Sequence, residues 1–292
     1  SPEYMPDMRW ILLLEAAAMT AAIDNAHKLR TRFTFRQPTN ENILSILFEC
    51  DDLHPLPEKE VRFNHHSVGI TRPMLCNGAD ESHDVFPLCS GYPDQLPRSS
   101  THTSDNVACS SINYKGWRIL RFQKRVGSGN QCYKRVQNAM YNWDFVSRDG
   151  KKSIGILSPK KPVHLANVKQ TQSTTVPRKG LLGTFSEIPL FKPLFVVNPI
   201  HAVYEMRDCR RTIPNNIVSS ASYATLDGHL LAGEERVSVI LRGNDAVDVE
   251  IVSFSRSAPS INGRIVWPFI GRMQKQFFLK EMEHLSRIAT YK

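Results

Sequence analysis

The sequence predicts an α+β fold in which an antiparallel sheet wraps around a long C-terminal helix. Strands are indicated at 194–206, 237–241 and 247–252, and a Gly-Asn turn joins the last two as a hairpin. A helix is indicated over 268–289, where large apolar residues recur at helical spacing. A meander of strands closed by one amphipathic helix is typical of an α+β domain with its core between the two.

The spacing of apolar residues predicts both the hairpin and the last helix. In the return strand, Val247, Val249 and Ile251 alternate with Asp248 and Glu250, which is the pattern of a strand with one buried face. We interpret the helix's apolar residues as a core-facing stripe rather than a cofactor site. They are Ile270, Met273, Phe277, Phe278, Met282, Leu285 and Ile288.

Residues 1–60 are predicted to form a helical N-terminal extension. The stretch 8–31 is rich in Ala and Leu and free of Gly and Pro, and its apolar residues lie nearly all round the helix. It must therefore be buried, either on its own domain or on a partner. Its most apolar run is shorter than the roughly 20 residues of a bilayer span, so no transmembrane helix is predicted. A second helix is predicted over 40–48, with Asn40 as its cap.

Residues 61–292 are predicted to form the α+β domain, with loop insertions at 77–110 and 147–180. A helix is indicated between the insertions at 130–143, with Tyr133, Val136, Met140 and Trp143 on one face. The first insertion is rich in Ser, Asp, Pro, Thr and Gly. A structureless loop of this length is uncommon in a compact domain, so a partner subunit is the simplest element to order it.

The second insertion is basic. It is interpreted either as a solvated loop or as a contact surface for RNA or an acidic protein. The candidate contact residues are Lys151, Lys152, Lys160 and Lys161.

Composition restricts the class of protein without choosing a function. The 292 residues carry a formal charge of +9, from 37 basic and 28 acidic side chains, and 41% of them are hydrophobic. Global disorder is excluded, whereas contact with nucleic acid, acidic lipid or acidic protein is allowed. The six cysteines show no CxxC spacing, which argues against a zinc ribbon, and we expect reduced thiols.

The segment DGHLLAGEERVSVIL at 227–241 is the best candidate for acid–base chemistry. His229 precedes Glu234 and Glu235, and a histidine within reach of a carboxylate can relay a proton. On a strand, however, the two glutamates point to opposite faces and cannot both act at one site. We interpret the segment as structural or pocket-lining, with catalysis as the alternative.

Other motifs give no cofactor or metal prediction. The pair His65-His66 with Cys76 matches no standard metal spacing. The Gly-Ser-Gly run at 127–129 is too short for a phosphate loop, and no GxSxG nucleophile elbow occurs. We therefore predict no metal site and no cofactor.

Four segments together resemble the uncharacterised domain-of-unknown-function nineteen-ninety family of bacterial and plant proteins. They are NHHSVGITRP at 64–73, VGSGNQCYKRVQNAMYNW at 126–143, SYATLDGHLLAGEERVSVIL at 222–241 and VEIVSFSRSAPSINGRIVWPFIGRMQKQF at 249–277. The resemblance covers 61–292 apart from the insertions. It implies a START-like helix-grip architecture, in which an apolar ligand lies between sheet and helix, and it brings no established activity. Its signature positions here are Gly228, His229, Gly233, Glu234, Glu235 and Arg236.

Our leading functional hypothesis is a non-enzymatic accessory subunit of a large organellar assembly, such as a ribosome or a respiratory or ATP synthase complex. The basic insertions and the apolar extension motivate it. Its partners would be other protein subunits, with ribosomal RNA as a further candidate. We expect a mitochondrial location, with plastid or cytoplasm as alternatives. The N-terminal Ser1 fits either a removed presequence or a trimmed terminus.

Two rival functions stay open. The first is a START-like binding protein for a lipid or another apolar small molecule. The second is an uncharacterised enzyme that uses His229 with Glu234 or Glu235.

Overall fold

The computed structural model describes one curled antiparallel sheet and three helices. The described residues are 29, 31–48, 62–65, 68–69, 71, 108–114, 116–143, 154–161, 163, 177, 179–187, 193–211, 215–258 and 261–290. The strands are β1 (Arg32–Thr34), β2 (Ala108–Tyr114), β3 (Trp117–Ser128), β4 (Ile154–Leu157), β5 (Leu181–Glu187), β6 (Phe195–Arg211), β7 (Asn216–Thr225), β8 (Leu231–Leu241) and β9 (Ala246–Ser257). The helices are α2 (Ile43–Phe48), α3 (Gly129–Asn142) and α4 (Ile261–Thr290).

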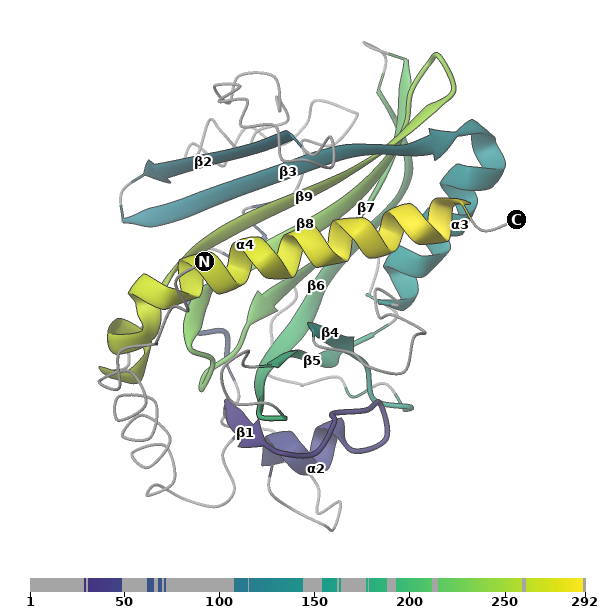
Figure 1. Ribbon diagram of the computed structural model, residues 1–292. Helices are drawn as coiled ribbons and strands as arrows, with labels where there is room; N and C mark the ends of the chain where they lie inside the picture. The colour runs from purple at the N-terminus through teal and green to yellow at the C-terminus, as the bar shows by residue number, and fades with distance from the viewer. Residues whose placement is uncertain are drawn as a thin grey trace, which may run out of the picture.

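The sheet wraps around α4 (Figure 1). Its strand order is β2-β3-β9-β8-β7-β6-β5-β4, and β1 pairs with β6 beside this path. All neighbouring strands are antiparallel. The helix α4 packs against β3, β9, β4 and α3, while α3 also covers β8. The predicted α+β class, with a sheet around a long C-terminal helix, is confirmed.

The main core lies between α4 and the face of the sheet that we call the inner face. Val237 and Val239 of β8 and Val249 and Ile251 of β9 are buried there. The helix contributes buried Phe277, Phe278, Met282 and Leu285, and Ile288 is partly buried. The opposite face is called the outer face below.

Two details of α4 differ from the prediction. The helix begins at Ile261, so Pro268 lies inside it rather than at its start. Met273 was predicted to face the core, but it is 38% exposed. Helical spacing places Met273 near the edge of the stripe, where solvent reaches it. The side chain of Ile270 lies outside the described residues.

The N-terminal region contributes a strand and a helix to the domain. Arg32 pairs with Val197 and Thr34 with Phe195, so β1 joins the sheet at β6. Ile43 of α2 packs against β5, where a Cβ on Gly183 would lie 2.5 Å from Ile43 Cδ1. The pairing and packing tie this part of the predicted extension to the sheet.

The predicted helix over 8–31 lies outside the described residues except for Leu29 and Thr31, which are not helical. The second predicted helix is present as α2, but Asn40 does not cap it. Asn40 Oδ1 instead accepts a hydrogen bond from Ser158 N at 3.1 Å. Thr39 Oγ1 accepts from Asn42 N at the start of the helix.

The two predicted insertions each contain part of a strand. Residues 77–107 lie outside the described residues, and β2 begins at Ala108. Within the predicted irregular stretch 147–180, β4 pairs with β5, and Ile156 and Leu157 are buried. Four residues are too few to show a periodicity in sequence, which is why β4 was not predicted.

Candidate functional site

Glu234 and Glu235 point to opposite faces of β8, as strand alternation predicts. Glu235 lies beside Tyr223 and Ser253 in the sheet and projects toward α4. Glu234 lies beside Phe254, and its hydrogen bonds are to residues on the outer face. The two glutamates therefore belong to separate sites.

On the inner face, Glu235 meets a second buried carboxyl, Glu281 of α4. Glu281 is 2% exposed, and Tyr223 Oη donates a hydrogen bond to Glu235 Oε2. Among the described residues, no donor reaches Oε1 of Glu235 or either carboxyl oxygen of Glu281. Three buried acceptors of one carboxyl pair are thus left without a donor.

Burial raises the pKa of both carboxyls because both lose water. The charge of Glu235 raises the pKa of Glu281 further. Two carboxylates this close in a low dielectric cannot both ionise readily. The pair therefore holds at least one proton near neutral pH, which Glu281 can share with Glu235.

The side chains on the inner face change from aliphatic to polar at Glu235. On one side along β8 and β9 lie the aliphatic side chains of the main core. On the other side, Gly233 pairs with Ser255, and Ser255 hydrogen-bonds Gln274 of α4 at 3.1 Å. Directly opposite residues in an antiparallel pair share a face. The carboxyl pair therefore marks the boundary between an aliphatic half and a small, polar half of this face.

On the outer face, Glu234 binds the segment we call the strap, the described residues 62–65, 68–69 and 71. Its carboxylate accepts from the backbone N of Gly69 and of Thr71, from Thr71 Oγ1 and from Ser222 Oγ. His65 Nε2 also contacts Gly233 O at 2.8 Å. Burial raises the pKa of Glu234, and these donors oppose the rise.

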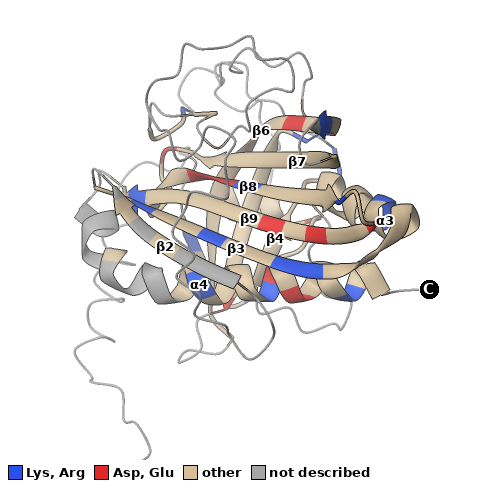
Figure 2. Ribbon diagram, turned by 90° about the horizontal axis from the view of Figure 1, so that it is seen from above, with Lys and Arg blue, Asp and Glu red and all other residues tan. Residues whose placement is uncertain are grey.

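Arg236 completes the attachment of the strap. Its Nη1 donates to Thr71 O at 2.6 Å, and its Nη2 pairs with Glu250 at 2.7 Å. Glu250 also pairs with Arg121 at 2.5 Å. Burial opposes ionisation of Glu250, but the two guanidinium groups outweigh it and lower its pKa. Figure 2 shows acidic positions on β8 and β9 and basic positions on β3, the strand that neighbours β9.

His229 is not brought to either glutamate. Its buried Nδ1 accepts a hydrogen bond from Leu231 N at 2.8 Å, and burial lowers its pKa to about 3. The imidazole is therefore neutral and supports the turn that leads into β8. Gly228 fits that turn because its φ is +86°.

Gly233 is required by close strand packing. A Cβ at this position would lie 2.3 Å from the backbone O of Phe254. The signature positions therefore have different roles. Gly228 and His229 belong to the turn, and Gly233 lets β8 and β9 pack closely. Glu234 and Arg236 hold the strap on the outer face, and Glu235 lies on the inner face.

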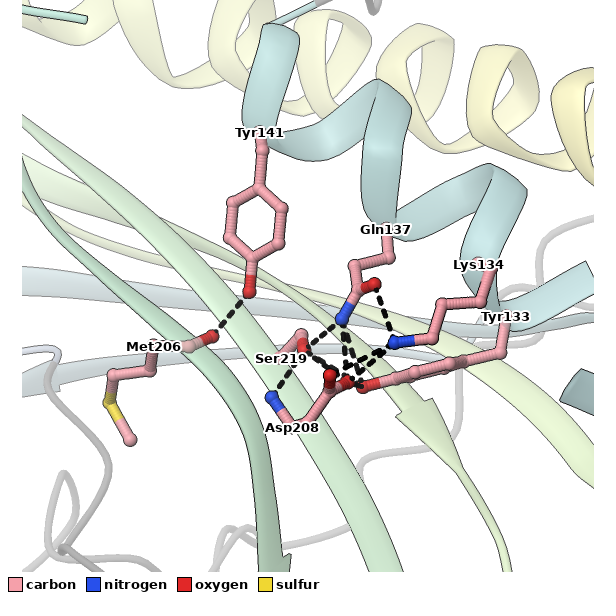
Figure 3. A network of polar contacts seen from close by, with 7 residues as sticks. All are labelled: Tyr133, Lys134, Gln137, Tyr141, Met206, Asp208 and Ser219. Carbon is pink, nitrogen blue, oxygen red and sulfur yellow. Dashed lines mark hydrogen bonds and ion pairs between the residues drawn. The ribbon is translucent and has the colours of Figure 1, made fainter. Parts of the chain in front are cut away.

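A third polar cluster docks α3 onto β6 and β7 (Figure 3). Asp208 lies at a register shift of β6 with φ of 48°, and it accepts from Tyr133 Oη at 2.9 Å and Gln137 Nε2 at 2.7 Å. Lys134 Nζ lies 2.9 Å from the same carboxylate. Ser219 Oγ accepts from Asp208 N. Because Asp208 has these partners already, we interpret the cluster as structural.

Sequence reasoning missed Glu281 and Tyr223. A signal was present, because Glu281 lies four residues after Phe277 and four before Leu285, on the apolar stripe of α4. A carboxyl on such a stripe indicates a buried acid. Its partner on β8 could not be chosen from the sequence.

The predicted basic contact residues are only partly described. Lys160 is exposed and lies 3.4 Å from Glu41, and Lys161 is exposed. Lys151 and Lys152 lie outside the described residues. Within the described part of the chain, no three metal-binding side chains gather, and no helix has the length and apolar character needed to cross a membrane.

Comparison with known proteins gives one sequence relative and several solved structures with low TM-scores. A UPF0548 protein of Arabidopsis thaliana is 29% identical over 168 residues, which cover 58% of this chain and 71% of the relative. Human STARD10 is 8% identical with a TM-score of 0.30, over 62% of this chain and 72% of that structure. A START superfamily protein from Mycobacterium smegmatis is 16% identical with a TM-score of 0.28, over 58% of this chain and 92% of that structure.

The family model described as "Domain of unknown function (DUF1990)" matches residues 103–283. The match includes three of the four segments that carried the resemblance, and the segment at 64–73 precedes it. The matched residues include β8, β9 and most of α4, and therefore both carboxyls of the inner face. The chain belongs to the DUF1990 family.

Proposed function

We propose that the protein binds a small molecule with an apolar body between the inner face of the sheet and α4. The observation that carries this proposal is the Glu235–Glu281 pair, with three buried oxygens that lack a donor in the described part of the chain. A buried acceptor without a donor costs on the order of 1–3 kcal/mol. A proton shared by the two carboxyls engages two of these oxygens, the one that carries it and the one that accepts it, so a bound molecule with a donor group would satisfy the third.

The surroundings of the pair support an amphipathic ligand. Val237 and Ile251 lie on the aliphatic side of the carboxyls, and Ser253 and Ser255 lie beside them or on the polar side. An apolar body would pack on the first group while its polar end reaches Glu235. The START-like alternative predicted from the family resemblance places a ligand in the same region.

Native mass spectrometry of the mildly purified full chain tests the proposal. We expect a bound small molecule that is released on denaturation and recovered by solvent extraction. Delipidated protein should bind Nile red, a neutral apolar dye, with a stoichiometry near one. A chain that carries no small molecule and binds no apolar probe would contradict the proposal.

Two buried serines offer a matched pair of variants. Ser253→Leu fills the inner face beside Glu235 and should weaken dye binding at least tenfold. Ser238→Leu places the same side chain on the outer face of the neighbouring strand and should leave dye binding unchanged. Near-UV circular dichroism checks that each variant is folded. Equal dye binding by two folded variants would place the ligand elsewhere.

The accessory-subunit hypothesis and the mitochondrial location stay predictions, as does the enzyme alternative. A pull-down at mild salt, with identification of any bound subunits, tests the first. The enzyme alternative draws no support from His229, whose ring nitrogen is bonded to the backbone of Leu231.

A further inference from the structure

We infer that the Glu235–Glu281 pair receives the ammonium group of a primary amine and releases one proton as the amine binds. The inference rests on the proposed function and names the ligand's polar end. A primary ammonium offers three N–H donors, and three carboxyl oxygens of the pair lack a donor in the described part of the chain.

The charges around the pair favour a cation. Besides burial, Glu281 is affected by Glu235 alone among the described titratable groups, and Glu235 is affected by Glu281 and by Tyr223, which is neutral. Within the described part of the chain, no Lys, Arg or His side chain compensates either acid. A buried charge is normally paired, so an incoming cation would supply the missing partner.

Two other buried carboxylates of the sheet, Glu250 and Glu234, do have donors. Glu250 lies between Arg121 and Arg236, and Glu234 accepts from two backbone N–H groups and two hydroxyls. The fold thus supplies donors to the buried carboxylates on its outer face. On the inner face, Glu281 has no such donor among the described residues.

The proton balance follows from charge conservation. Above the pKa of Glu235, which burial raises to about 7, the free pair carries one proton and a net charge of about −1. When the ammonium enters, both carboxyls ionise, and the site again carries a net charge of about −1. One proton therefore leaves to solvent for each amine bound, and no covalent bond forms or breaks.

Isothermal titration calorimetry with octylamine, 1-octanol and octanoate tests the inference, because the three probes share one chain and differ in the head group. The full-length, delipidated protein is titrated at pH 7.5 in phosphate and in HEPES, whose ionisation enthalpies differ and neither of which is a primary amine. We expect octylamine to bind at least tenfold more tightly than octanol, and octanoate to bind most weakly. The difference in enthalpy between the buffers should correspond to about one proton released per octylamine.

A pair of variants on α4 separates the site from the rest of the helix. Glu281→Gln should remove both the preference for octylamine and the proton release, while octanol binding is kept. Glu283→Gln changes an exposed carboxyl that is paired with Arg287 and should behave as the unchanged protein. If Glu281→Gln does not fold, the affinity of the unchanged protein for octylamine is measured at several pH values instead. In the pH range below the pKa of the pair, the affinity for octylamine should increase as the pH is raised, by up to about tenfold per pH unit.

The outcomes distinguish the inference from the function on which it rests. If octylamine and octanol bind equally, or no proton is released, the inference is wrong and the binding function stands. If octanoate binds most tightly, the inference is also wrong. If none of the probes binds and the purified chain carries no small molecule, both fail.

Discussion

Glu235 on β8 and Glu281 on α4 lie together between sheet and helix, and only one of their four oxygens has a donor among the described residues. The donor is the hydroxyl of Tyr223 on the neighbouring strand. The sheet and the helix, which pack on one side of this point through the apolar residues of the main core, are thus joined here by two acids.

Glu281→Gln is expected to stabilise the protein at neutral and alkaline pH. Burial and the charge of Glu235 raise the folded-state pKa of Glu281 above its ordinary value of 4.5, so the folded state binds more protons than the unfolded state above that pH. Stability therefore falls as pH rises from about 5 toward 8, by up to about 1.4 kcal/mol per pH unit for one proton. Urea unfolding at pH 5, 6.5 and 8 should show a flatter profile for the variant.

The control for this prediction is Glu283→Gln, on the exposed side of the same helix. It should keep the pH profile of the unchanged protein. A Glu281→Gln profile parallel to that of the unchanged protein would show that the carboxyl titrates normally.

Glu234→Gln is expected to loosen the strap without unfolding the sheet. The amide offers one acceptor oxygen where the carboxylate serves four donors, and its NH₂ group faces the backbone N–H of Gly69. Hydrogen exchange at the amides of Gly69 and Thr71 should accelerate about tenfold, which corresponds to about 1.4 kcal/mol. Glu235→Gln, on the other face, should leave both amides unchanged. Equal protection in the two variants would show that Glu234 does not hold the strap.

Gly233→Ala is expected to destabilise the protein by about 3 kcal/mol or more, because β8 and β9 must separate to admit a Cβ that would lie 2.3 Å from Phe254 O. Gly116→Ala is the control. Unlike Gly233, Gly116 has a backbone conformation that favours glycine, with φ of +78°, but a Cβ added there would meet no atom within 4 Å. Its cost should be about 1–2 kcal/mol. Thermal unfolding measures both, and equal losses would contradict the close-packing explanation.

Asp208→Asn should be nearly neutral, whereas Asp208→Ala should destabilise by about 2 kcal/mol. Asparagine tolerates the left-handed φ of 48° and keeps an acceptor for Tyr133 and Gln137. It loses the ion pair with Lys134, which is about half exposed and contributes little. Alanine loses the acceptor and adds backbone strain. Chemical denaturation measures the free energy of unfolding of both variants. An equal decrease in the two would indicate that the ion pair with Lys134 dominates.

The sequence by itself determined the faces of the regular elements. Alternation over 247–252 predicted which residues of β9 face the core, and the same rule separated Glu234 from Glu235. Helical spacing predicted α3 and most of α4, because a period of 3.6 is a local property of the chain. The signature at 228–236 was identified too, although its residues do not form one site.

Only the tertiary structure decided which faces meet. β4 and β1 are too short to carry a periodicity, and they exist as strands because β5 and β6 offer hydrogen-bonding edges on which they pair. Glu281 could be placed on the apolar stripe of α4 from sequence, but its contact with Glu235 depends on how far the sheet curls around the helix. Local patterns fix the direction of a side chain, whereas its partner is fixed by packing between segments distant in the chain.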